Sequence, residues 1–316
     1  MERRRMLKSL LAGSLFVGLP GMLCAQQPRP KSGVVPVQNV EPATARVADT
    51  EPVQVNPAEL ERILKEWETK TAKITKLRGV HQRYEYDYVF SQEKRAVGSF
   101  WHEAPDKGRI DFNCKEQPAI PADGVNTQKV DAQGNPFRVA AEAPMMWICT
   151  GSDIFSIDVA NKTFDQIEIP PPDRGENIMD GPLPFLFGMK AEKLKARYKM
   201  SLGQMNGTQG RDDRMVYHLV AIPLLQEDAR NWQRAEVRLD AQYCLPIAIR
   251  LIDPSGNKET VYVFPLTEMK ANSPWDAIMP DPFKPRLSGF KLQQSQPAAP
   301  DRQQNVLDPG ISPITR

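Results

Sequence analysis

Residues 234–264 contain three segments in which apolar and polar side chains alternate, and this pattern constrains the fold more than any other. The segments are Arg234–Asp240, Leu245–Ile252 and Thr260–Phe264. Alternation with a period of two is typical of a β-strand that has one buried face. Residues 253–257, Asp-Pro-Ser-Gly-Asn, favour a tight turn between the second and third segments. The pattern therefore predicts three consecutive antiparallel strands with one apolar face, which another part of the molecule has to cover.

The first 25 residues have the features of a secretory signal peptide. Met1–Lys8 is basic, Ser9–Leu23 is apolar, and Leu23-Cys24-Ala25 forms a cleavage site before Gln26. The apolar stretch is short for a membrane span and is interrupted by glycine and proline, although a retained anchor is the alternative. Arg3–Lys8 also resembles a twin-arginine export signal. We expect an exported protein of the periplasm or cell envelope.

Four cysteines occur in the chain, and Cys24 would leave with the signal peptide. An oxidising compartment favours disulfides, and an odd number of remaining cysteines indicates one bridge and one free thiol. Cys114 and Cys149 end neighbouring predicted strands, so these two could be bridged. The alternative is three buried, reduced cysteines. The cysteine spacings match neither a zinc site nor a C-x-x-C redox pair.

Composition indicates one domain with unstructured ends. Residues 26–56 are rich in Pro, Val, Ala and Gln without a periodic apolar face, and residues 287–316 are rich in Pro, Gln and Asp. We expect the first to be a disordered tether and the second a disordered tail. The folded domain then spans residues 57–286. Within it, the Pro- and Gly-rich residues 117–136 are predicted to form an insertion loop.

The domain is predicted to begin with an amphipathic helix. Asn56 is suited to cap it, Pro57 fits the first turn, and Gly79 is a good terminator, so the helix should end near Arg78-Gly79. An apolar stripe follows at helical spacing, made of Leu60, Ile63, Leu64, Trp67, Thr71 and Ile74. About ten short strands in mostly meander order come after it, and two or three helices remain to cover them. The fold class is therefore α+β, mainly β, with a single curved antiparallel sheet.

Aromatic side chains are concentrated on these strands and in a proline-rich segment. A strongly curved sheet covered by few helices tends to leave a concavity, and apolar residues around it make a pocket for apolar ligands. Residues 181–189 are very apolar and punctuated by Gly and Pro, which prevents a regular strand, so a mobile lid and plain packing are the two interpretations. The candidates for the cavity and lid are Tyr84, Tyr86, Tyr88, Phe100, Leu183, Phe185, Leu186, Phe187 and Met189.

The sequence contains no recognisable catalytic motif. Its three histidines lie in separate predicted strands and none has a metal-ligand spacing. Nucleophile-elbow, zinc-protease, P-loop and dinucleotide motifs are missing as well. The net charge of +2, without a basic patch that contains aromatics, argues against nucleic acid as a partner. We expect neither an enzyme nor a cofactor, and the lack of heptad repeats favours a monomer.

The order of these parts resembles the LolA/LolB-like superfamily of periplasmic lipoprotein carriers. The resemblance lies in the leading helix, in Gly98–Phe112 (G-S-F-W-H-E-A-P-D-K-G-R-I-D-F), in Trp147–Phe155 (W-I-C-T-G-S-D-I-F) and in the terminal hairpin. Residues 169–194 look like those of a distinct bacterial subfamily. The resemblance implies an unclosed β-barrel with helices at its mouth and a hydrophobic cavity that accepts acyl chains. Arg109 is its polar candidate, with a surface arginine as the alternative interpretation.

Three functional hypotheses follow. The first is non-enzymatic binding of acyl chains, lipid or lipoprotein in the cell envelope, through a hydrophobic cavity under a helical or loop lid. The second is an interaction or stress-sensing module that binds an envelope protein, and a cavity filled by the protein's own side chains would favour it. The third, a hydrolase of an envelope polymer, requires carboxylates that converge in a cleft.

Overall fold

The computed structural model describes residues 56–171, 174, 185, 190–204, 208–209 and 214–296. All of them belong to the second of two units into which the chain divides, Val40–Arg316. The predicted signal peptide and residues 26–55 of the predicted tether lie outside the described residues. Within the described part, no helix is both long and apolar enough to cross a membrane.

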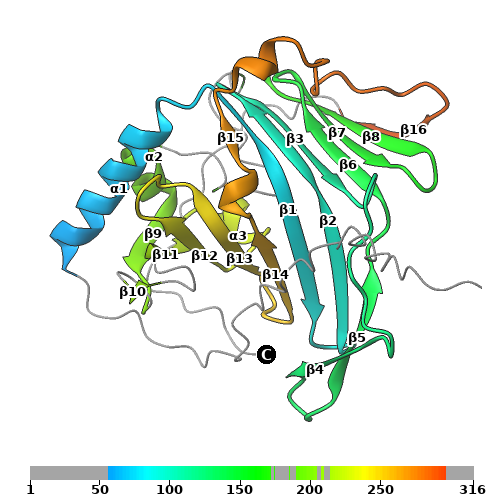
Figure 1. The fold of residues 1–316 in the computed structure, drawn as a ribbon, viewed down its shortest axis with the longest axis horizontal. Helices are drawn as coiled ribbons and strands as arrows, with labels where there is room; N and C mark the ends of the chain where they lie inside the picture. The colour runs from blue at the N-terminus through cyan, green and yellow to red at the C-terminus, as the bar shows by residue number, and fades with distance from the viewer. Residues whose placement is uncertain are drawn as a thin grey trace, which may run out of the picture. The chain divides into compact units, whose positions relative to one another are not determined.

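The described residues build one 16-stranded sheet (Figure 1). Its main path runs in the order β10 (Thr208–Gln209), β11 (Met215–Pro223), β12 (Arg234–Asp240), β13 (Pro246–Ile252), β14 (Lys258–Val263), β1 (Lys76–Asp87), β2 (Gln92–Glu103), β3 (Lys107–Phe112), β6 (Met145–Cys149), β7 (Asp153–Asp158), β8 (Thr163–Glu168) and β16 (Lys291–Gln296). Four strands lie off this path, namely β9 (Tyr198–Leu202) beside β11, β15 (Lys270–Ala271) beside β1, and the hairpin of β4 (Val125–Val130) and β5 (Pro136–Ala141) beside β2.

The predicted fold class is confirmed, because the molecule is mainly β and its single sheet is unclosed. Three α-helices accompany the sheet in the described part, α1 (Pro57–Thr71), α2 (Ala191–Arg197) and α3 (Gln226–Ala229). The meander predicted from residues 234–264 is present, since β12, β13 and β14 pair antiparallel in sequence order. Two pairs among the described strands are parallel, β5 with β2 and β16 with β8.

Helix α1 begins where the sequence predicts. The Asn56 side chain accepts a hydrogen bond from the Ala58 N–H at 3.1 Å, and Pro57 occupies the first turn. The helix ends at Thr71, not near Gly79, because β1 already begins at Lys76. Gly79 instead lies against the ring of Phe100, where an added Cβ would come within 2.8 Å of a ring carbon.

The main hydrophobic core lies between α1, α2 and one face of the sheet, which we call the inner face. Ile63, Leu64 and Trp67 of α1 and Leu194 of α2 pack there. The strands contribute Leu77, Phe100, Ile110, Phe112, Leu219, Val237, Leu239, Ile249, Tyr262 and Phe264. The opposite face, which we call the outer face, carries two smaller clusters.

Two segments predicted to lack structure contribute strands. Residues 117–136, predicted to form a loop, contain β4 and lead into β5. Phe137 of β5 is fully buried against Tyr86 and Tyr88, which explains why this hairpin is held on the outer face. The tail predicted from residue 287 contains β16, and Leu287 and Phe290 pack on the outer-face cluster of Ile148, Phe155 and Ile157.

Candidate functional site

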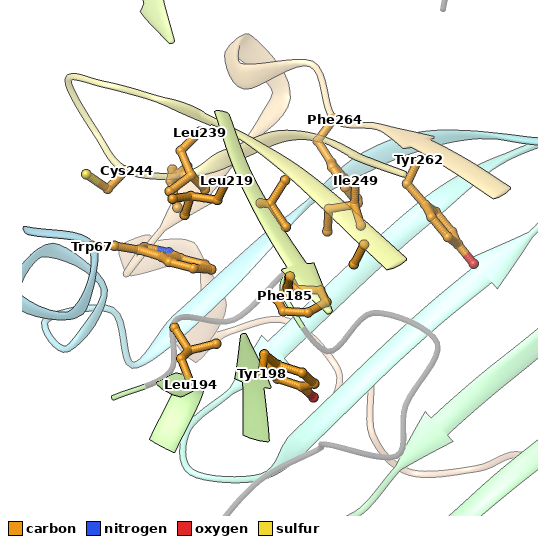
Figure 2. Close-up of a cluster of buried hydrophobic side chains, with 14 of the residues drawn as sticks. Trp67, Phe185, Leu194, Tyr198, Leu219, Leu239, Cys244, Ile249, Tyr262 and Phe264 are labelled. Atoms are coloured by element: carbon orange, nitrogen blue, oxygen red, sulfur yellow. The ribbon is translucent and has the colours of Figure 1, made fainter. Parts of the chain in front are cut away.

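Among the described residues, a cluster of buried hydrophobic side chains packs on the inner face around Phe185 (Figure 2). Phe185 has an exposed fraction of 0%. Its ring centroid lies 5.4 Å from that of Tyr198 and 5.5 Å from that of Trp232, and the latter two are 5.2 Å apart. Aromatic pairs at such separations contribute beyond their buried area. Phe185 is thus the predicted lid residue that the structure places in the core.

A partly buried ion pair lies next to these aromatic rings. Arg197 donates to the Asp228 carboxylate at 2.5 and 3.0 Å, and Asp228 lies in α3. The Tyr198 hydroxyl donates to the same carboxylate at 3.5 Å. Burial raises the pKa of Tyr198, so its hydroxyl remains protonated at neutral pH. These contacts hold α3 against the strand that carries Tyr198.

Polar groups occupy the part of the inner face contributed by β1. His81 is 1% exposed, and its Nε2 lies 2.9 Å from the Asp111 carbonyl oxygen. Burial lowers the pKa of His81 to about 4, so the ring is neutral at pH 7. Arg83 forms ion pairs with Glu142 and, at 2.6 Å, with Glu85. The charges are therefore matched within the protein, which is typical of structural rather than catalytic groups.

The structure separates the predicted cavity aromatics onto two faces. Phe100 belongs to the inner-face core, where its ring meets that of Phe264 at 5.5 Å. Tyr84, Tyr86 and Tyr88 belong to an outer-face cluster with Phe137, Val261 and Val263. Phe137 of the β4–β5 hairpin packs on Tyr86 and Tyr88, and Tyr84 stacks on Tyr86, so the three tyrosines do not share a site with Phe100. Leu183, Leu186, Phe187 and Met189 lie outside the described residues.

Arg109 is a structural contact on the outer face. It donates to the Asp111 carboxylate at 2.7 Å and to the Pro282 carbonyl oxygen at 2.9 Å, and its guanidinium lies 5.2 Å from the Trp101 ring. The resemblance singled it out as a polar candidate. Its hydrogen bond to Pro282 connects β3 to the segment after β15.

The predicted bridge between Cys114 and Cys149 is wrong, because Cys114, Cys149 and Cys244 are all free thiols. The strand register explains this result. Cys149 is opposite Gly108, whereas Phe112 is opposite Met145, so Cys114 lies beyond the far end of this pairing. Burial raises the pKa of Cys149 to about 11 and that of Cys244 to about 11, which makes both poor nucleophiles.

A small pocket opens on the outer face at the start of β1. Its volume is about 40 Å³, and it is lined by Lys76, Leu77, Arg78, Trp101, Glu103, Asp276, Met279, Pro280, Pro282 and Phe283. Small-molecule sites usually measure roughly 300–1,000 Å³. The pocket is therefore too small to enclose a drug-sized ligand or a long acyl chain. None of the sequence-predicted cavity residues lines it.

Sequence reasoning missed the residues that surround Phe185. Tyr198 and Trp232 flank α2 and α3, and no periodic pattern connects them to residue 185. The sequence feature that could have pointed to them is a single large aromatic residue after each of two short helices. Groups of three or more His, Cys, Asp or Glu side chains that could bind a metal ion do not occur among the described residues.

Comparison with known proteins shows likeness in fold alone. No protein-family model matches the sequence, and no curated protein matches it. Solved structures with a similar backbone include a conserved protein from Thermus thermophilus, at 8% identity and a TM-score of 0.39, covering 75% of this chain and 99% of the other. A LolA superfamily protein from Nitrosomonas europaea matches at 9% identity and a TM-score of 0.33, covering 71% and 99%.

The Pseudomonas aeruginosa MucA/MucB complex contains a third such chain, at 11% identity and a TM-score of 0.35. The match covers 71% of this chain and 61% of that one, so this chain spans less than two thirds of its length. A protein of the superfamily named from the sequence motifs is thus among the solved structures to which this chain is similar. Identities this low assign no residue role and no ligand to this protein.

Proposed function

We propose that this protein is a non-enzymatic binding protein of the bacterial cell envelope, acting as an interaction module whose interior is already filled. The observation that supports this choice is the packing around Phe185. Trp67, Phe185, Leu194, Tyr198, Leu219 and Leu239 are each at most 1% exposed on the inner face. An apolar ligand could enter there only by displacing side chains that already fill the space.

The energetic cost of such displacement favours the filled interior. Fully burying a Leu or Phe side chain stabilises a protein by about 1.5–3 kcal/mol. A ligand that expels several of these side chains must replace their contacts before it gains any affinity. The interior therefore stabilises the scaffold. A partner would bind to the surface of the sheet and to its flanking segments.

The envelope location rests on the sequence of residues 1–25, which has the basic, apolar and cleavage regions of an export signal. One neighbour in fold, MucB, is a protein solved in complex with another protein, MucA. A protein partner in the same compartment is consistent with our proposal. The ion pairs that Arg83 forms with Glu85 and Glu142 also favour a structural role for these inner-face charges over catalysis.

A second candidate function is the binding of an acyl chain, lipid or lipoprotein by exchange for Phe185. The Phe185 ring is held through aromatic contacts with Tyr198 and Trp232. An acyl chain gains about 0.8 kcal/mol per buried methylene, so a long chain could compensate for the loss of one phenyl ring. Phe185 belongs to the proposed lid, whose other predicted members are Leu183, Leu186, Phe187 and Met189.

Titration with a fluorescent fatty acid separates the two candidates. The interaction module predicts no saturable binding by the wild-type protein. Phe185→Ala, which removes most of the ring, is expected to create space and weak binding, whereas Phe90→Ala is a matched control because Phe90 is 73% exposed on a turn. Saturable binding by the wild type that Phe185→Asp abolishes and Phe90→Asp preserves would establish acyl-chain binding instead.

A further inference from the structure

An exposed apolar turn follows β15, at the end of β1 that carries the small pocket. The 3₁₀ turn η3 spans Pro274–Ala277. Trp275 is 66% exposed, Ile278 72% and Met279 43%. Single exposed apolar side chains are common, but three within five consecutive residues give this turn an apolar surface, which is typical of interaction sites. We call these three side chains the apolar turn.

Hydrogen bonds of Asp276 hold the backbone of the apolar turn in place. Asp276 and Ser273 form a capping box, in which the Ser273 N–H donates to the Asp276 carboxylate at 3.1 Å. The other oxygen of Asp276 accepts from Arg78 of β1 at 2.6 Å. Figure 1 shows this turn beside the ends of β1 and β15. Because the turn is already ordered, binding through it requires little further loss of conformational entropy.

Cationic side chains lie near the turn in the sequence and around the adjoining pocket. Lys270 and Lys284 are exposed on either side of it in the sequence. Lys76 and Lys107 share one carboxylate, that of Glu103, at 3.0 and 3.1 Å. The Lys107 ammonium also lies 5.8 Å from the Phe283 ring, which places this positive charge next to the pocket beside Met279.

Four carboxylates lie among these cations, those of Glu103, Glu268, Asp276 and Asp281. Asp276 is neutralised by Arg78, and the Asp281 carboxylate accepts the Phe283 N–H at 2.9 Å. Glu268 is the exposed acid closest in sequence to Lys270. With Lys76, Arg78, Lys107, Lys270 and Lys284 there are five cations to four carboxylates, so a small positive excess remains to attract an anionic surface.

We propose that the apolar turn docks this protein on an anionic lipid bilayer, with Trp275, Ile278 and Met279 entering the interface and the lysines facing the headgroups. Trp is favoured at the membrane–water interface, and each Lys near an anionic surface adds to the attraction. Protein–protein hot spots are usually buried in recessed pockets ringed by contacts that exclude water. Here the largest side chains project from a turn, which suits lipid better. This inference does not depend on what fills the inner face.

Quenching of tryptophan fluorescence by lipids with brominated acyl chains tests the proposal on the protein as isolated from its host. The vesicles contain phosphatidylcholine with phosphatidylglycerol, or phosphatidylcholine alone. We expect stronger quenching with phosphatidylglycerol, and loss of most of that quenching in Trp275→Phe. Ile278→Ser should weaken partitioning about tenfold, and Lys270→Gln with Lys284→Gln should remove the preference for anionic vesicles.

Phe90→Ser is the matched control, because Phe90 is equally exposed at the opposite end of β1. Its partitioning should equal that of the wild type. The proposal is overturned if quenching persists in Trp275→Phe, if Ile278→Ser and Phe90→Ser bind alike, or if the wild type does not bind anionic vesicles. In the last case the apolar turn would belong to a protein interface instead.

Discussion

The backbone carbonyl oxygen of Asp111 lies directly above Gly98, and His81 reaches the same oxygen from β1. The distance from His81 Nε2 to this oxygen is 2.9 Å, and a Cβ added to Gly98 would lie 1.7 Å from it. A buried neutral histidine and a glycine without a side chain thus allow β1, β2 and β3 to approach one another beneath the core. Two predictions arise from this relationship.

The first prediction concerns the dependence of stability on pH. Burial lowers the pKa of His81 and of His102 to about 4, from an ordinary value of 6.5. Between these values the unfolded chain binds protons that the folded chain does not, so the free energy of unfolding falls as the pH drops. Each histidine contributes up to about 1.4 kcal/mol per pH unit in that window.

Chemical denaturation of the wild type and of His81→Gln, at several pH values between 7 and 4.5, measures this contribution. The free energy of unfolding of His81→Gln should depend less steeply on pH than that of the wild type, by the contribution of one bound proton. This difference does not depend on the stability of the variant at pH 7. Glu236, whose pKa is lowered to about 2 by His218 and nearby arginines despite its burial, acts mainly below this window. An identical slope in both proteins would show that His81 is not held neutral.

Gly98→Ala should destabilise the protein by about 3 kcal/mol or more, because the added methyl overlaps backbone that cannot move without disturbing β3. Gly134→Ala is the control. Gly134 has a φ of +84° but no atom within 4 Å of the added Cβ, so only backbone strain of about 1–2 kcal/mol is expected. Equal losses in denaturant unfolding would contradict the close approach at Asp111.

Leu64→Ala tests whether α1 is part of the scaffold. Leu64 is fully buried between the helix and the inner face, and its truncation should cost about 2–5 kcal/mol. The neighbouring Lys65→Ala should change the free energy of unfolding by less than about 0.5 kcal/mol, since Lys65 is 67% exposed and its ion pair with Glu61 spans 3.6 Å. If Leu64→Ala also costs little, α1 would be a loosely held cover.

Thiol chemistry tests the corrected cysteine assignment. Burial raises the pKa of all three thiols, that of Cys149 and of Cys244 to about 11. Under native conditions at pH 8, Cys114 should react first with an alkylating agent, because it is half-buried whereas Cys149 and Cys244 are buried. Peptide mapping without reductant should find these three residues unbridged. A peptide that links Cys114 to Cys149 would require a shift of the register between β3 and β6.

Local patterns predicted the elements whose signals lie within a short stretch of sequence. The alternation in residues 234–264 gave β12, β13 and β14, and Asn56-Pro57 gave the start of α1. The helix end was placed too late because Gly79 was taken for a terminator, whereas it accommodates the Phe100 ring. That role depends on a cross-strand neighbour, which no local pattern reveals.

The candidate site was harder to predict, because a period of two identifies a face but not which face is covered. The alternation that groups Tyr84, Tyr86 and Tyr88 is real, but Phe137 packs on Tyr86 and Tyr88 from a hairpin whose first strand lies in the predicted loop. The parallel pairing of β16 with β8 joins segments more than a hundred residues apart in the sequence. Composition alone predicted Phe185 as a lid residue, and its partners Tyr198 and Trp232 were not predicted.

Native mass spectrometry with lipid extraction, on the protein isolated from its own export pathway, tests the central proposal most directly. A filled inner face predicts the mass of the bare polypeptide, with no acylated species released on denaturation. Added fatty acid should also leave that mass unchanged. Co-purified acylated molecules that leave on denaturation, and return when fatty acid is added, would contradict the filled interior and establish the protein as an acyl-chain carrier.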